Sequence, residues 1–288
     1  MKKFFVGCGV VVVVFLVLAI VGIYVFSQWA QDMLPEIEDF ARNRAELVER
    51  YGALPEYVPP LDGAYDPGLV ARFVDVRESL QPRQDALAAD FDEILGRAPE
   101  DRPSGIGGFI DEMRSAMGMV ARTARYTAFS DSVLMAHEMG RGEYGHIQLA
   151  FLYGWSNLAD ERAAWSAALE TGRADDEAVE AAAELFDAHA RRSREVLREH
   201  LANLRREIDT SAAGDSALAF LAAVEGGSSE LPFTDPVPAT LEAAFEAHEV
   251  RLRVTTPNTL GQWLAEAPAL LEEEDFDESR SREVTVEF

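Results

Sequence analysis

The chain opens with a long apolar run and then changes to a mixture of apolar and charged residues. Residues 4–26 contain no charged side chain, and only Met1, Lys2 and Lys3 precede them. In an α-helix each residue rises about 1.5 Å, so about 20 apolar residues cross the ~30 Å hydrocarbon layer of a bilayer. The pattern therefore predicts a single transmembrane helix at residues 4–26.

Two other interpretations of this run stay open. A cleaved secretory signal has a shorter apolar centre and small residues at its cleavage site, and here Val25 and Ser27 make only a poor site. Gly7-Cys8 looks like the end of a lipoprotein attachment motif, but in lipoproteins the apolar stretch precedes the cysteine, whereas here almost all of it follows Cys8. An uncleaved anchor fits the length of the run best.

The charges on the two sides of the run predict its orientation. Lys2 and Lys3 precede it, whereas the first charged residues after it are Asp32 and Glu36. Basic residues next to a membrane helix tend to stay in the cytoplasm. We therefore expect residues 1–3 to be a cytoplasmic stub in the inner membrane of a bacterial envelope, with the remaining chain periplasmic or extracellular.

Beyond the anchor, the spacing of apolar residues and the abundance of Ala, Leu, Glu and Arg favour helices throughout. We predict an all-α protein in which the transmembrane helix is followed by an acidic, elongated helical bundle. The expected parts are a membrane-proximal helix over 27–53, a proline-rich connection over 54–66, a helical domain over 67–271 and an acidic, frayed tail over 272–288.

Local signals mark the connection and the helix after it. Pro55, Pro59 and Pro60 break helical structure, so we expect the connection to run extended between the membrane-proximal helix and the domain. Asp66 followed by Pro67 is a typical helix start. The apolar spacing that follows carries this helix to about Leu95.

Charge and cysteine content narrow the possible partners. The chain has 51 acidic and 26 basic residues, a formal net charge of −25, which repels nucleic acid. Cys8 is the only cysteine, so no disulfide forms within the chain and stability has to come from packing. We expect the bilayer and another envelope protein as partners, and no nucleic acid.

The most distinctive feature after the anchor is a row of large aromatic residues. Tyr144, Phe151, Trp155 and Trp165 fall near helical spacing and share one face of a predicted helix. Such a row usually fills the centre of a bundle. The functional alternative is a groove for a partner, a peptide or an apolar ligand.

Metal and catalytic motifs are incomplete. Glu143 and His146 form one Glu-x-x-His pair, but a di-iron bundle needs two such pairs and two further Glu. They are weak metal-site candidates, and we expect no cofactor. His189 and His200, with Arg191, Arg192 and Arg194, lie on a strongly charged helix and are expected to be solvated.

These observations favour a non-catalytic scaffold or interaction subunit of the cell envelope, held in the membrane by one helix. The alternative is an extracytoplasmic binding module whose aromatic row lines a pocket for an apolar ligand or peptide. An enzyme is the least favoured class, and Glu143 and His146 are the residues that it would use.

Overall fold

A computed structural model describes residues 41–95, 105–156, 176–257 and 259–266. All regular secondary structure in these ranges is helical, which confirms the all-α prediction. None of these helices is both long and apolar enough to cross a membrane. The predicted transmembrane helix at 4–26, Trp165 and the tail over 272–288 lie outside the described residues.

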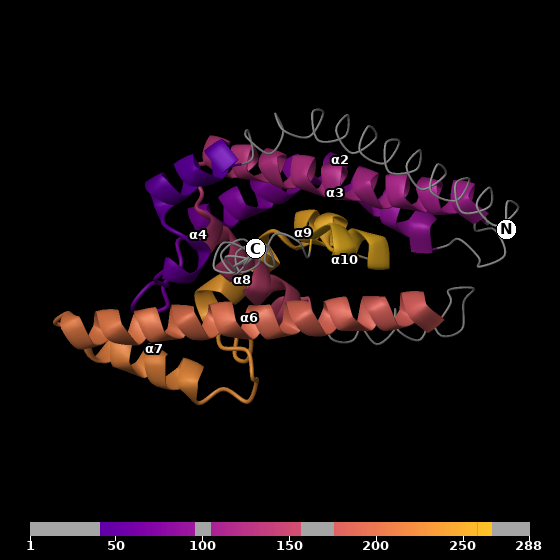
Figure 1. Cartoon of the computed structure of the whole chain (residues 1–288). Coiled ribbons are helices and arrows are strands. Elements are labelled where there is room, and N and C mark those ends of the chain that lie inside the picture. The colour runs from indigo at the N-terminus through magenta and orange to yellow at the C-terminus, as the bar shows by residue number, and fades with distance from the viewer. Residues whose placement is uncertain (1–40, 96–104, 157–175, 258, 267–288) are drawn as a thin grey trace, which may run out of the picture.

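Long helices form two sides of the molecule, and short helices lie between them (Figure 1). One side consists of α2 and α3, which run next to each other, and the other consists of α6 with α7 against it. The bounds are α2 (Pro67–Leu95), α3 (Gly105–Ala136), α4 (Arg141–Leu149), α6 (Asp176–Thr210), α7 (Asp215–Glu225), α8 (Ala239–Ala247), α9 (Glu249–Thr255) and α10 (Leu260–Glu266). A π-helical turn, η3 (Ala150–Trp155), continues α4 directly.

The start and end of α2 agree with the sequence prediction. The Gly68 backbone N–H donates to Asp66 Oδ1 at 2.9 Å, and Pro67 occupies the first helical position. Asp66 thus satisfies a backbone donor that has no partner within the helix. The helix ends at Leu95 and contains Pro82 in its interior.

The centre of the core is aromatic. Phe73 of α2, Phe151 of η3 and Phe245 of α8 are fully buried, and their ring centroids are 5.7 to 6.5 Å apart in tilted or edge-on geometry. Aromatic pairs prefer such arrangements over face-to-face stacking. This cluster fixes α4 and η3 between α2 and α8.

The proline-rich connection differs from its prediction. Residues 41–51 are helical, and Leu54–Glu56 forms a short 3-10 helix, η1. Leu47 and Leu54 are buried, and η1 packs on α4 and α6. Pro55 is tolerated because the first turn of a helix does not need its N–H. The connection is therefore part of the packed body, not an extended spacer.

Candidate functional site

The structure separates the aromatic residues that the sequence grouped together. Tyr144 and Phe151 are buried in the core, whereas Trp155, at the end of η3, is only half-buried. One face of the Trp155 indole stacks on Phe151, with centroids 5.6 Å apart. The Arg253 guanidinium lies over the indole at 5.6 Å from its centroid, a cation–π contact. Of the described members of the row, Trp155 alone reaches the surface.

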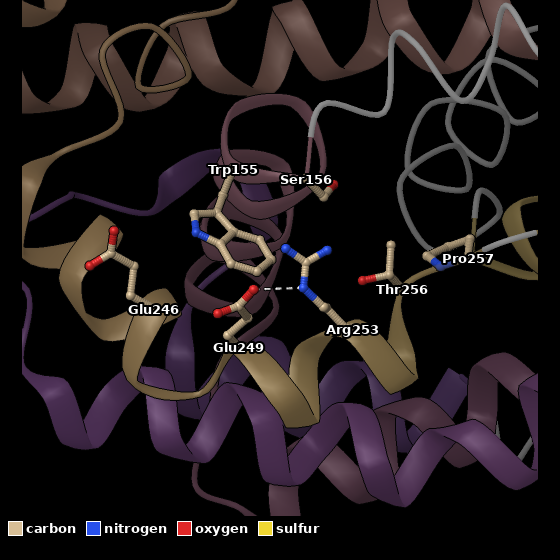
Figure 2. Close-up of a pocket in the computed structure, with 7 residues that line it drawn as sticks. All are labelled: Trp155, Ser156, Glu246, Glu249, Arg253, Thr256 and Pro257. Atoms are coloured by element: carbon tan, nitrogen blue, oxygen red, sulfur yellow. Dashed lines mark hydrogen bonds and ion pairs between the residues drawn. The ribbon is translucent and has the colours of Figure 1, made fainter.

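Trp155 lines an open cavity of about 560 Å³, which we call the Trp155 recess. Its lining residues come from the end of η3 and the residue after it, from α8, from α9 and from the segment after α9: Trp155, Ser156, Glu246, Glu249, Arg253, Thr256 and Pro257. Figure 2 shows the indole between Glu246 on one side and Arg253 on the other, and Arg253 Nε donates to Glu249 Oε1 at 2.7 Å. The recess therefore combines an aromatic ring with both signs of charge.

An apolar surface adjoins the recess. Val250 and Val254 are 79% and 66% exposed, and their spacing of four residues places them on one side of α9. Val250 directly follows Glu249, and Val254 directly follows Arg253; Glu249 and Arg253 both line the recess. Successive residues of an α-helix are rotated by about 100°, so the valine side is turned by about 100° from the recess side of α9. We call the Trp155 recess together with Val250 and Val254 the α9 surface.

Glu143 and His146, the weak metal candidates, have different partners in the structure. Glu143 is half-buried, and its Oε1 lies 4.0 Å from Arg72 Nη2. Burial raises the pKa of Glu143, and Arg72 partly opposes the shift. His146 is completely buried, and its two ring nitrogens lie within hydrogen-bond distance of Tyr65 Oη and His200 Nδ1. Neither nitrogen is left for a metal or a substrate. Within the described ranges no group of three or more His, Cys, Asp or Glu side chains is arranged to hold a metal ion.

His189 and His200 are buried, so the expectation that they are solvated is wrong. Both lie on the side of α6 that packs against the body, in helical register with Val196, Leu204 and Ile208. Arg192 is also buried. The spacing of these residues in the sequence matches that of the apolar residues of α6. Because their side chains are polar, the sequence nevertheless favours a place at the surface.

Four groups from three parts of the chain form a hydrogen-bonded series, which we call the histidine relay. Tyr65 Oη lies 2.7 Å from His146 Nε2, and His146 Nδ1 lies 3.2 Å from His200 Nδ1. His200 Nε2 lies 2.7 Å from the Leu54 carbonyl oxygen. Burial lowers the pKa of both rings, to about 4 for His200, so both imidazoles are neutral at neutral pH.

A second buried polar cluster, formed around Asp131, links three helical segments. Asp131 of α3 is fully buried, and its carboxylate contacts Arg44 at 3.0 Å and Arg141 at 3.7 Å. Buried charges in proteins are normally paired because an unpaired charge carries a large desolvation cost. This cluster joins the helix over 41–51 to α3 and to the start of α4.

Two features of the described residues bear on function: the accessible α9 surface and the buried histidine relay. The first has an aromatic ring, charges of both signs and exposed valines at the surface, which are features of a binding surface. The second is enclosed by protein and acts within the fold. Comparison of the chain with protein-family models, with curated proteins and with solved structures gives no match.

Proposed function

We propose that this chain is a single-pass membrane-anchored protein of the bacterial cell envelope that acts without catalysis, by holding another envelope protein on its α9 surface. The observation that supports this most is the exposure of Val250 and Val254 beside the Trp155 recess. Adjacent exposed apolar side chains next to a recess are typical of a surface that a partner covers.

The valines occupy a rigid position. On the opposite side of α9, Leu252 and Thr255 are buried. Arg251 donates to Asp75 and Glu78 of α2 at 2.6 Å each, which anchors α9 on α2. A surface that is already ordered loses little conformational entropy when a partner binds. The α9 surface is therefore organised before any partner arrives.

Charge restricts the kind of partner. The recess contains two carboxylates, Glu246 and Glu249, and one guanidinium, Arg253, and the whole chain carries a net charge of −25. Complementary charge speeds association and excludes wrong partners. We expect a protein segment with apolar side chains for the valines and at least one Lys or Arg for the carboxylates.

Site-specific photo-crosslinking in native membranes tests this function. A photoreactive amino acid is introduced at Val250 or at Val254 in the full chain, and the matched control carries it at Leu218, which is 52% exposed on α7. The expected result is the same crosslinked protein from both α9 positions and none from Leu218. Recovery of the chain without an adduct, or of identical adducts from all three positions, would contradict the proposal.

The size of the recess supports a second candidate, a binding module. A volume of about 560 Å³ lies within the range of small-molecule sites. Because charged groups line it, the ligand would be amphipathic with a cationic group, whereas the sequence suggests an apolar ligand or a peptide. The test is mass spectrometry of small molecules that purify with the full chain. A ligand present in the native protein and lost in Trp155→Ala would support this candidate, and equal recovery from both would remove it.

A further inference from the structure

We propose that the histidine relay is an acid-released latch that holds the proline-rich connection, residues 54–66, against the helical body. This inference does not depend on the partner of the α9 surface. It rests on the geometry of Leu54, Tyr65, His146 and His200, on the absence, among the described residues, of a carboxylate bonded to either ring, and on the place of the connection between the predicted anchor and the bundle.

The direction of every hydrogen bond in the relay follows from one atom. The Leu54 carbonyl oxygen only accepts, so His200 Nε2 carries the proton that it receives. The Nδ1 of the neutral His200 ring then accepts from His146 Nδ1–H, and His146 Nε2 accepts from the Tyr65 hydroxyl. Two neutral rings thus fill every donor and acceptor position in the series.

Among the described residues, no carboxylate forms a hydrogen bond or an ion pair with either ring; the partners of the ring nitrogens are Tyr65, the Leu54 carbonyl oxygen and the rings themselves. The aromatic neighbours are Tyr57, at 5.2 Å from His146 and 5.4 Å from His200, and Phe233, at 4.7 Å from His146. The nearest charged group on the same helix, Glu143, lies one turn before His146 and faces Arg72. In the part of the chain that the structure describes, the only titratable groups that contact the rings are the two tyrosines and the rings themselves.

An added proton therefore disrupts the series. If His200 takes it on Nδ1, that N–H faces the Nδ1–H of His146, and two donors oppose each other. If His146 takes it on Nε2, Tyr65 has to stop donating to that nitrogen. In both cases a positive charge is buried between two rings whose Nδ1 atoms are 3.2 Å apart. Release of the connection gives the charged ring access to water.

The connection is held mainly at its two ends. The relay binds Leu54 at the start and Tyr65 at the end of this segment, and Asn203 of α6 donates to the Pro55 and Tyr57 carbonyl oxygens at 2.8 and 3.2 Å. Thr240 of α8 also holds the end of the segment: its hydroxyl accepts from the Tyr65 backbone N–H at 3.0 Å and donates to the Gly63 carbonyl oxygen at 2.7 Å. Loss of the relay removes one bond at each end and leaves the Asn203 contacts near the start and the Thr240 contacts near the end. The segment that would come free lies between the predicted membrane-proximal helix and the bundle, so its release changes how the bundle is held relative to the membrane.

Distance measurement by electron paramagnetic resonance tests the latch in the full chain in detergent micelles. Spin labels are attached at Val58→Cys in the connection and Leu218→Cys on α7, both exposed, with Cys8→Ser to remove the native thiol. The native relay should give a narrow distance distribution at pH 7 that broadens as the pH falls to about 4. The double variant His146→Gln, His200→Gln should keep its narrow distribution, because a glutamine amide both donates and accepts but takes no proton.

His189→Gln is the matched control, because His189 is a buried histidine of α6 that contacts Tyr153 and not the connection. This variant should still release the connection in acid. A native distribution unchanged at pH 4, or equal broadening in the double glutamine variant, would overturn the latch.

If the double variant does not fold, ¹⁵N chemical shifts of the native imidazoles decide. At pH 7 His146 should carry its proton on Nδ1 and His200 on Nε2, and both rings should titrate together with the distance change. Release of the connection while both rings stay neutral would equally overturn the proposal.

Discussion

Arg77 and Glu266 are 189 positions apart in the sequence, yet their side chains form a buried ion pair of 2.6 Å that joins α2 to α10. The two residues are only 2% and 5% exposed. Burial opposes the charge on the guanidinium, but Glu266, together with Tyr144 and Tyr126, more than compensates, and the pKa of Arg77 lies above its usual value. Gln84 also donates to Glu266 Oε1, at 2.8 Å. This pair links the last described helix, α10, to α2.

Glu266→Gln should destabilise the protein by about 3–5 kcal/mol, because it leaves the buried Arg77 without its counter-ion. Arg50→Gln is the control, since it breaks an exposed pair with Glu46 that contributes about 0.5 kcal/mol at most. Urea unfolding of both variants measures the difference. The double change Arg77→Met, Glu266→Leu should recover much of the loss. A Glu266→Gln effect no larger than that of Arg50→Gln would contradict this account.

Acid should destabilise the fold partly through His189. Burial lowers the pKa of this ring to about 4, whereas the unfolded chain titrates near 6.5. The unfolded state therefore binds the proton first as the pH falls, so the contribution of the neutral ring is complete above about pH 6.5 and is lost as the pH falls towards 4. At about 1.4 kcal/mol per pKa unit, the loss is on the order of 3 kcal/mol.

The measurement is the free energy of unfolding at several pH values between 7 and 4.5. His189→Gln should give a flatter dependence on pH than the native protein, because one group that titrates between the two states has been removed. Its stability at pH 7 need not match, since Gln replaces the contact with Tyr153. Parallel curves for the two proteins would show that His189 does not contribute to acid destabilisation.

Two glycines on different helices should respond oppositely to alanine. A Cβ at Gly142 of α4 would lie 2.6 Å from Tyr57 Cβ and 3.1 Å from the Leu54 carbonyl oxygen, so Gly142→Ala should cost about 1–3 kcal/mol. A Cβ at Gly118 of α3 meets only the end of the Arg122 side chain, at 3.9 Å, so Gly118→Ala should stabilise by about 0.5–1 kcal/mol. Thermal unfolding compares them. A stabilising effect of Gly142→Ala would show that the connection does not approach α4 this closely.

The exposed valines should matter for binding and not for folding. Val250→Ser with Val254→Ser should change the free energy of unfolding by about 0.5 kcal/mol or less, because exposed side chains away from special features contribute little. Leu252→Ala on the buried side of the same helix should cost about 2–5 kcal/mol. With a photoreactive residue at Glu246, the serine variant should lose its crosslinked partner while folding normally. An undiminished crosslink would place the partner elsewhere.

Helix type and the boundaries of α2 could be predicted because their causes are local. The Asp66 cap, Pro67 at the first position and the apolar spacing up to Leu95 act within a few turns of one helix. The proline-rich connection could not be predicted in the same way. Prolines indicate that a segment does not form a regular α-helix, but they do not indicate whether other helices cover it. The burial of Leu54 against α4 and α6 therefore could not be predicted from the sequence.

The candidate site was predicted only in part. Spacing placed Tyr144, Phe151 and Trp155 on one face, and it is α8 and α9, much later in the chain, that decide which of them are covered and which lines a recess. A count of histidines likewise could not show that His146 and His200 meet.

The sequence by itself determined that the described elements are helices, where α2 begins and ends, and that the chain is strongly acidic, because propensity, capping and charge are properties of single residues and near neighbours. Only the tertiary structure decided which polar groups are buried together. The contact of His200 with Leu54 spans 146 positions and that of Arg77 with Glu266 spans 189. Such pairs form because folding removes both polar groups from water, and each group then provides the hydrogen-bond or ionic partner that the other has lost. A local sequence pattern contains no information about which distant residue provides that partner.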